Sequence, residues 1–198
     1  MILLFGSQYT LEKMSTNTLV NRPSQRPDVI DEILTSLKRY DVSVIKDLED
    51  YLFDQYENDY SDLNSNLALL KLYELSDETS VERQDSTLKI LIKGLIQFTN
   101  SDFTLYLHLL PPYIFTTTNE YTTKIQGLVS LYELLIANKF DQFLAKNKEL
   151  SLVDDHSVKL IEQTFLSNKN SKFIMSEAVS EEVSVTRLSK VVGQLLQN

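Results

Sequence analysis

The feature that most limits the fold of this 198-residue chain is its shortage of the residues that make tight turns. It has only four glycines and four prolines. A β-sandwich or β-barrel needs many tight turns, which these residues favour, so such folds are disfavoured. Helices joined by short polar connections fit better, and a hydrophobic content of 42% is enough for a buried core.

Apolar residues recur at spacings of three and four along most of the chain, which predicts a succession of amphipathic helices. Such helices cannot bury their apolar stripes alone, so we expect them to stack as helical hairpins. A polar loop is expected over residues 76–85. The expected helices cover residues 27–37, 42–56, 62–75, 86–98, 102–110, 119–138, 140–150, 154–165, 172–179 and 183–196.

The spacing also predicts which residues face the core. In the helix over residues 62–75 we expect Leu63, Leu67 and Leu70 to be buried. Gly94 lies inside a helix, where glycine costs ~1 kcal/mol relative to alanine, so we expect a neighbouring helix to approach closely there. Further inward residues are expected to be Val29, Ile30, Ile33, Leu34, Leu37, Val44, Ile45, Leu48, Leu52, Tyr56, Leu91, Leu95, Ile125, Leu128, Leu131, Leu135, Ile136, Phe143, Val158, Ile161 and Phe165.

The net charge of −9 is unevenly distributed. Residues 41–85 hold thirteen acidic residues against three basic ones, so this segment carries essentially all of the excess. An acidic face repels phosphate backbones, so we expect no direct binding of nucleic acid there. No apolar run approaches the ~20 residues of a membrane-spanning helix, and we expect a soluble protein, cytoplasmic or nuclear, with no membrane contact.

The sequence shows no catalytic or metal-binding constellation. Cysteine is absent, and His108 and His156 fall in different helices, so a metal site is disfavoured. The four glycines are isolated, so there is no phosphate-binding loop. We therefore expect no enzyme and no cofactor. Most aromatic residues fall at core spacing, with Tyr51, Tyr60 and Tyr106 as candidates for exposed interface anchors.

Two segments resemble a known family. Residues 62–73 read Asp-Leu-Asn-Ser-Asn-Leu-Ala-Leu-Leu-Lys-Leu-Tyr, and residues 101–105 read Ser-Asp-Phe-Thr-Leu. They resemble, in order, the segments Asp-Leu-Glu-Ala-Asn-Leu-Ala-Val-Leu-Lys-Leu-Tyr and Thr-Asp-Phe-Thr-Leu of the k-subunit family of eukaryotic translation initiation factor 3. Residues 131–135, 140–143 and 172–177 are similar to later segments of the same family.

This resemblance implies an all-α fold, with a stacked HEAT-like helical-repeat domain over residues 27–150 followed by a winged-helix-like segment over residues 151–198. Residues 1–26 precede these parts, and their Thr, Asn, Ser, Pro and Arg content predicts a disordered extension. The resemblance implies a non-catalytic scaffold subunit that pairs with other subunits of the factor, especially the l subunit, and reaches the small ribosomal subunit through the complex. The same architecture occurs in subunits of the proteasome lid and the COP9 signalosome.

The winged-helix part departs from the family pattern, because the wing strands and last helix do not follow Asn198. Either this lineage has lost the wing or the chain is a truncated product. The last expected helix then carries an apolar stripe that could bind a partner: Val183, Leu188, Val191, Val192, Leu195 and Leu196. Alternatively, the stripe packs back on Val158, Ile161 and Phe165.

Three other functions stay open at this stage. The chain could be a paralogous subunit of the proteasome lid or signalosome, against which the motif over residues 64–73 argues. It could be a free-standing helical-repeat adaptor that binds peptides. A hydrolase with a concealed site is a further alternative, which a deep polar pocket would favour.

Overall fold

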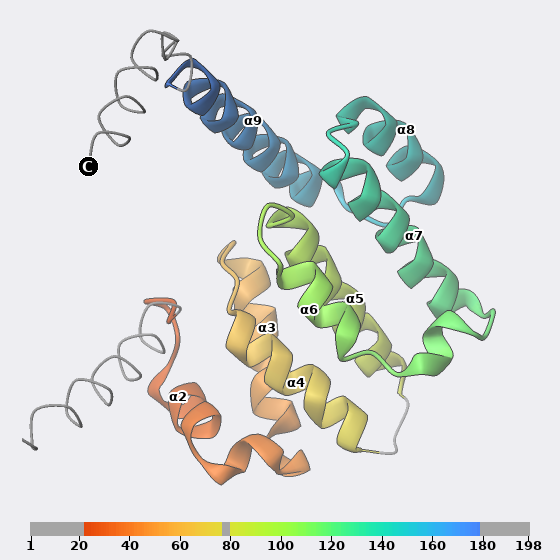
Figure 1. Ribbon diagram of the computed structural model, residues 1–198. Coiled ribbons are helices and arrows are strands. Elements are labelled where there is room, and N and C mark those ends of the chain that lie inside the picture. Colours follow the sequence, from red (N-terminus) through yellow and green to blue (C-terminus); the bar gives the residue numbers. More distant parts are fainter. Residues whose placement is uncertain (1–21, 77–79, 179–198) are drawn as a thin grey trace, which may run out of the picture.

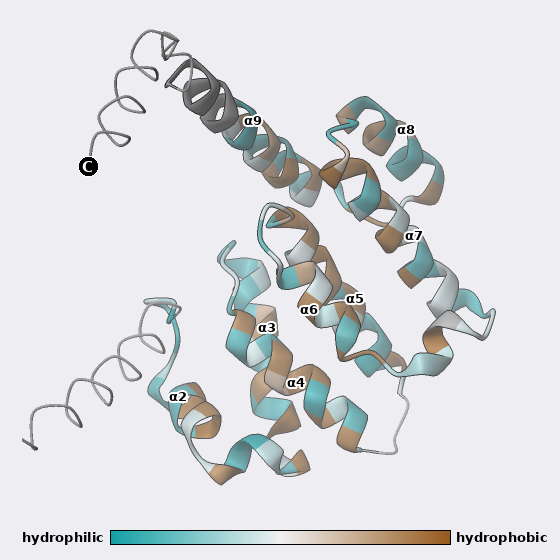
Figure 2. Ribbon diagram, viewed as in Figure 1, coloured by the Kyte–Doolittle hydropathy of each residue, from teal (hydrophilic) through white to brown (hydrophobic). Residues whose placement is uncertain are grey.

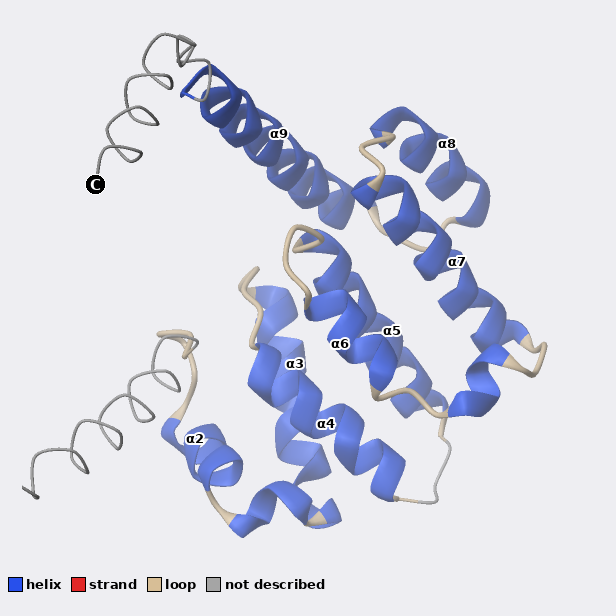
Figure 3. Ribbon diagram, viewed as in Figure 1, coloured by secondary structure: helices blue, strands red, loops and turns tan. Residues whose placement is uncertain are grey.

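The computed structural model describes residues 22–76 and 80–178, and within that part every regular element is a helix (Figure 3). The all-α prediction is therefore confirmed, whereas the HEAT-like and winged-helix details stay predictions. None of the described helices is long and apolar enough to cross a membrane. The α-helices are α2 (Asp28–Thr35), α3 (Ile45–Glu57), α4 (Leu63–Leu75), α5 (Val81–Ile96), α6 (Asp102–His108), α7 (Glu120–Ile136), α8 (Phe140–Leu150) and α9 (Asp155–Ala178), and the 3-10 turns are η1 (Leu37–Tyr40), η2 (Val42–Val44) and η3 (Pro112–Phe115).

Successive α-helices pack as hairpins. Figure 1 shows α3 beside α4, α5 beside α6 and α7 beside α8, with α2 next to the first pair. The first part of α9 packs on α5, and its far end leads away from the hairpins. Side chains at the helix starts fix the boundaries, since Asp62 accepts a hydrogen bond from the Ser65 amide and Asn119 forms a capping box with Thr122.

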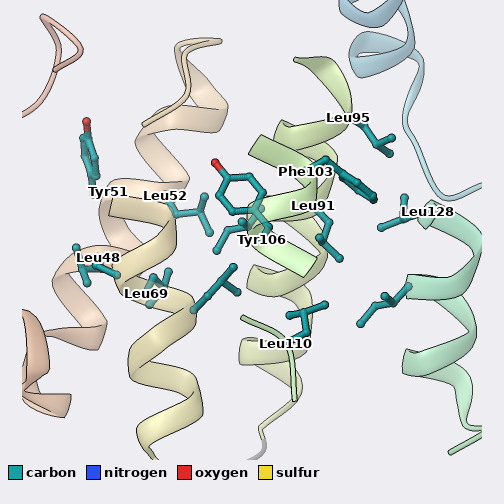
Figure 4. Packing of buried hydrophobic residues seen from close by; sticks show 14 of the residues in the cluster. Leu48, Tyr51, Leu52, Leu69, Leu91, Leu95, Phe103, Tyr106, Leu110 and Leu128 are labelled. Atoms are coloured by element: carbon teal, nitrogen blue, oxygen red, sulfur yellow. The ribbon is translucent and has the colours of Figure 1, made fainter. Parts of the chain in front are cut away.

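One hydrophobic core runs through all of these pairs. It begins at Ile30 and Ile33 on α2 and ends at Ile161 on α9 (Figure 4 shows its central part). Figure 2 shows that apolar residues concentrate where helices face one another. Phe165 extends the contact, because its ring lies 4.9 Å from that of Phe140, centroid to centroid. Residues of the predicted winged-helix segment thus pack directly on the predicted repeat domain.

Gly94 lies where α5 and α6 approach each other, as expected. A Cβ at this position would lie 2.9 Å from the Cα of Phe103, closer than a carbon atom can approach a backbone atom without displacing it. The absence of a side chain therefore allows α6 to pack directly on α5, and the prediction of a close approach is confirmed.

Two helix boundaries were wrong. The expected loop over residues 76–85 is shorter, because α5 begins at Val81 rather than at residue 86 and the hydroxyl of Ser80 accepts a hydrogen bond from the Arg83 amide. The expected helices over 154–165 and 172–179 are one continuous helix, α9. The polar residues between them, which include Asn168, contain no glycine or proline that would break a helix.

Several predicted core positions were also wrong. On α4 the prediction is confirmed for Leu70, which is buried, whereas Leu63 and Leu67 are only partly buried. The other buried residues of α4 are Ser65, Asn66, Ala68, Leu69 and Leu72. The three remaining errors are exposed side chains near helix ends, where little chain is left to cover them: Val29, Leu37 and Ile136.

Residues 22–26 belong to the segment predicted as a disordered extension. In the structure Arg22 and Arg26 form ion pairs with Asp31, and the Arg26 side chain is buried. Residues 1–21 lie outside the described residues. The division of the chain into extension, repeat domain and winged-helix segment stays a prediction.

Candidate interaction surface

The predicted partner-binding stripe lies outside the described residues, which end at residue 178. Its members are Val183, Leu188, Val191, Val192, Leu195 and Leu196. The stripe therefore stays a prediction. In the alternative, the stripe would fold back on Ile161 and Phe165. Ile161 is already buried in the core, and the Phe165 ring already packs on the rings of Phe98 and Phe140.

The two histidines are far apart in the fold and have separate roles. His108 ends α6, where its Nδ1 donates to the Thr104 carbonyl oxygen at 2.6 Å. His156 begins α9, and its Nε2 lies 2.8 Å from an oxygen of Asp59. Both side chains are exposed, and no group of three metal-ligating side chains occurs in the described part of the chain.

A buried ion pair joins the N-terminal segment to the first hairpin. Arg26 donates from Nε and Nη2 to the two carboxylate oxygens of Asp62, at 2.5 and 2.6 Å. The Asp62 side chain is fully buried, and the Tyr51 hydroxyl also donates to it at 3.1 Å. Burial disfavours the charge on Arg26, but hydrogen bonds to Asp62 and Asp31 outweigh that effect, so its pKa is raised.

The polar network continues inward from this ion pair. The Gln55 side chain accepts from the Asp62 amide and exchanges hydrogen bonds with Asn66, which also donates to the Tyr106 hydroxyl. Lys93 on α5 donates to the Gln55 carbonyl oxygen at 2.7 Å. No buried side-chain polar atom in the described part of the chain lacks a hydrogen-bond partner. The members of the network are hydrogen-bonded to one another and join α3, α4, α5 and α6.

Burial changes the pKa values of several side chains in this network. It raises the pKa of Tyr106 to about 12 and that of Tyr51 further still, so both phenols stay protonated at neutral pH. It lowers the pKa of Lys93, whose ammonium also lies 4.5 Å from the centroid of the Tyr56 ring. These shifts are consequences of packing several polar groups into the core.

An apolar groove crosses the surface between α4, α6 and η1. It has a volume of about 410 Å³, and its floor includes Leu67, Leu105 and Leu109, with Tyr40 at one end. Leu105 is 40% exposed and Tyr40 is 57% exposed. A second hollow of about 330 Å³ lies between α2 and the start of α4. Arg39 lines both, so the two hollows meet at its side chain.

The sequence analysis chose the wrong aromatic residues as surface anchors. Tyr51 and Tyr106 are buried because their hydroxyl groups belong to the polar network, and Tyr60 is half-buried with its hydroxyl bonded to Asp54. Exposed aromatic rings are instead found at positions that include Tyr40. The sequence does indicate that Tyr40 is exposed, since Leu37 and Tyr40 flank two basic residues in a stretch too short for an amphipathic helix.

Comparison with known proteins finds sequence similarity to subunits of eukaryotic translation initiation factor 3. Residues 83–168, from α5 into α9, match the model of the CSN8/PSMD8/EIF3K family. The chain is 38% identical over 131 residues to eukaryotic translation initiation factor 3 subunit K of Yarrowia lipolytica, an alignment that covers 65% of this chain and 56% of that relative. It is 32% identical over 123 residues to the subunit K of Pyricularia oryzae strain Y34, covering 62% of this chain and 51% of the relative.

A third relative, subunit K of Neurospora crassa, is 41% identical over 90 residues, which are 46% of this chain and 37% of that protein. The aligned region therefore spans about half the length, or less, of these curated relatives. The resemblance to the k-subunit family is confirmed by both kinds of comparison.

Proposed function

We propose that this chain, which is similar over part of its length to subunit K of eukaryotic translation initiation factor 3, is a non-catalytic scaffold subunit of that factor. The observation that carries the proposal is the 38% identity over 131 residues to a protein of that name. The helical hairpins described above suit such a role, because each helix offers an outer face to a partner once its inner face is buried. The polar network at their centre orients helices rather than substrates.

The partners that follow from this function are other subunits of the factor, the l subunit in particular, with the small ribosomal subunit reached through the complex. This places the chain in the cytoplasm. The proposal includes no cofactor and no direct contact with nucleic acid, which the excess of acidic residues over 41–85 supports. We further propose that the chain has a repeat domain over 27–150 and a winged-helix segment over 151–198, and that the stripe containing Val191 and Leu195 binds a partner.

The alternatives differ in their expected partners. The family whose model matches residues 83–168 also names signalosome and proteasome subunits, but the three relatives described above are all named as subunit K. The names of these relatives do not favour a subunit of the proteasome lid or the signalosome. A free-standing adaptor would have no stoichiometric partner among the subunits of any of these complexes.

The proposal is tested by purifying the tagged full chain from its own cells and quantifying co-purified proteins by mass spectrometry. Recovery of initiation factor 3 subunits, the l subunit most strongly, is the expected result. Lid or signalosome subunits in their place would refute the proposal in favour of the paralogous function, and the absence of any stoichiometric partner would leave the adaptor.

A paired variant tests the predicted stripe in the same experiment. Replacing Val191 and Leu195 together with aspartate is expected to reduce recovery of the l subunit while the circular dichroism of the chain stays unchanged. The matched control is Leu166→Asp, because Leu166 is an exposed apolar residue of α9 outside the stripe. Equal recovery with both variants would show that the stripe does not bind the partner.

A further inference from the structure

The groove formed by α4, α6 and η1 differs in charge from the chain that contains it. The chain has a net charge of −9, yet the two hollows that meet at Arg39 are lined by Arg22, Arg26, Arg39 and Lys71, with Asp31 as the lining carboxylate. Basic side chains on an acidic protein attract acidic partner segments to the extent that carboxylates of the same chain do not already pair with them.

Most of these charges are already matched within the chain. Arg22 and Arg26, which line the second hollow and not the groove itself, are paired with Asp31 and Asp62. Lys71 pairs with Glu74 at 2.6 Å on the exposed side of α4, where solvent weakens the pair. Arg39 differs from all of these.

Arg39 has no carboxylate partner among the described residues. Its guanidinium carbon lies 5.5 Å from the centroid of the Tyr40 ring, and the Arg39 side chain is exposed. A planar guanidinium with free donors is suited to bind a carboxylate through two hydrogen bonds. The place where the two hollows meet is therefore a point at which an incoming carboxylate would be favoured.

The floor beside Arg39 is apolar. Leu67 and Ala68 come from α4, Leu105 comes from α6, and Leu109 directly follows α6; the two helices lie side by side in Figure 1. An apolar floor between two helices, with a charge at one end, is the arrangement that receives one face of an amphipathic helix.

We infer that this groove binds an acidic amphipathic helix of a partner protein, with apolar side chains on Leu67, Leu105 and Leu109 and a carboxylate on Arg39. Charge complementarity selects this occupant. A nucleic acid would also bring negative charge, but the floor offers it apolar side chains and a single unpaired cation, whereas phosphate backbones are bound by several Lys or Arg side chains. The inference does not depend on which complex the chain belongs to.

The test measures binding of a labelled synthetic helix to the full chain by fluorescence anisotropy. The probe is a peptide of roughly four helical turns with leucines at helical spacing and glutamates elsewhere. A second peptide, used as the control, carries lysines in place of the glutamates. The glutamate peptide is expected to bind, and the lysine peptide to bind at least roughly tenfold more weakly, because its charges oppose Arg39.

Three variants assign the binding to the groove. Arg39→Glu should weaken the glutamate peptide by roughly tenfold or more and improve the lysine peptide, and since Arg39 is exposed the fold should persist. Leu105→Asp should remove binding, whereas Leu166→Asp, which changes an exposed leucine of α9, should alter it less than about twofold. Circular dichroism checks that each variant is folded.

Several results would overturn the inference. They are no binding of the glutamate peptide, equal binding of the two peptides, or a glutamate peptide that binds Arg39→Glu as tightly as the unchanged chain. Displacement of the peptide by a single-stranded oligonucleotide at lower concentration than by unlabelled peptide would assign the groove to phosphate instead.

Discussion

The buried ion pair between Arg26 and Asp62 leads to the sharpest stability prediction. Replacing Arg26 with methionine keeps much of the side-chain volume but leaves the fully buried Asp62 carboxylate with the Tyr51 hydroxyl and a backbone amide as its remaining donors. Removing one partner of a buried ion pair typically costs about 3–5 kcal/mol. That is a large part of the roughly 5–15 kcal/mol by which a domain is stable.

A double-mutant cycle separates the pair from its surroundings. Asp62→Asn keeps a side-chain oxygen to cap α4, so we expect Arg26→Met with Asp62→Asn to be less destabilised than the sum of the single changes. The coupling should be about 2–3 kcal/mol in the free energy of unfolding, from urea titrations followed by circular dichroism. Lys46→Met, which breaks the exposed pair with Asp50, is the control and should cost less than about 0.5 kcal/mol.

The part of the chain that opens first in Arg26→Met is also predicted. Arg26 joins α2 to the first hairpin, and Ile30 and Ile33 bury the helix beside it. Amide hydrogen exchange in Arg26→Met should therefore increase first at residues 28–35, before the rest of the chain opens. A cost below about 1 kcal/mol, a coupling near zero, or uniform exchange throughout the chain would each refute the reasoning, because each requires that the pair does not hold α2.

Three further predictions concern other parts of the core. Gly94→Ala should destabilise the chain by about 1–3 kcal/mol, because the added Cβ would clash with the Phe103 backbone. Gly127→Ala should be near neutral, because its added Cβ would contact only the flexible end of a leucine side chain. Thermal unfolding of the two variants compares these effects. Burial raises the pKa of Tyr106 from 10.0 to about 12, so the contribution of this phenol to stability is complete below pH 10, and up to about 2.7 kcal/mol of it is lost as the pH rises to about 12. The urea midpoint should therefore fall between pH 9 and pH 11 by less in Tyr106→Phe than in the unchanged chain. An equal fall in both proteins would contradict this prediction. Ile161→Ala should cost about 2–4 kcal/mol in one cooperative unfolding transition, and two separate transitions would show that α9 belongs to an independent domain.

The sequence was most informative where one apolar face and clear end signals coincide. The bounds of α8 were predicted correctly as 140–150, and Asn119 was placed correctly at the start of α7. The start of α5 was missed because its first residues give no apolar stripe, and Val81 is itself exposed. Apolar periodicity does not reveal a helical turn whose half-buried side chains, Arg83 and Gln84, are polar, and there the Ser80 cap marks the boundary.

The polar network could not be predicted for a related reason. Gln55, Asp62 and Asn66 are of residue types that are mostly exposed in proteins, so the sequence pattern does not predict their burial. Burial becomes favourable only when their partners are in place together, since a buried polar group without a hydrogen bond costs about 1–3 kcal/mol. The partners of Gln55 and Asp62 include Arg26 and Lys93, which are distant in sequence. Such a set is visible only in the fold.

The error on α4 and the apolar groove have the same origin. Helix α4 carries apolar residues on two sides, one buried through Leu69 and Leu72 and one turned toward the surface through Leu67. The spacing predicted a single stripe through Leu63, Leu67 and Leu70, and of these three only Leu70 belongs to the buried side. The buried side is instead completed by Asn66 in the polar network. With the core filled in this way, the second stripe is left over, and it forms the floor to which we assign a partner helix.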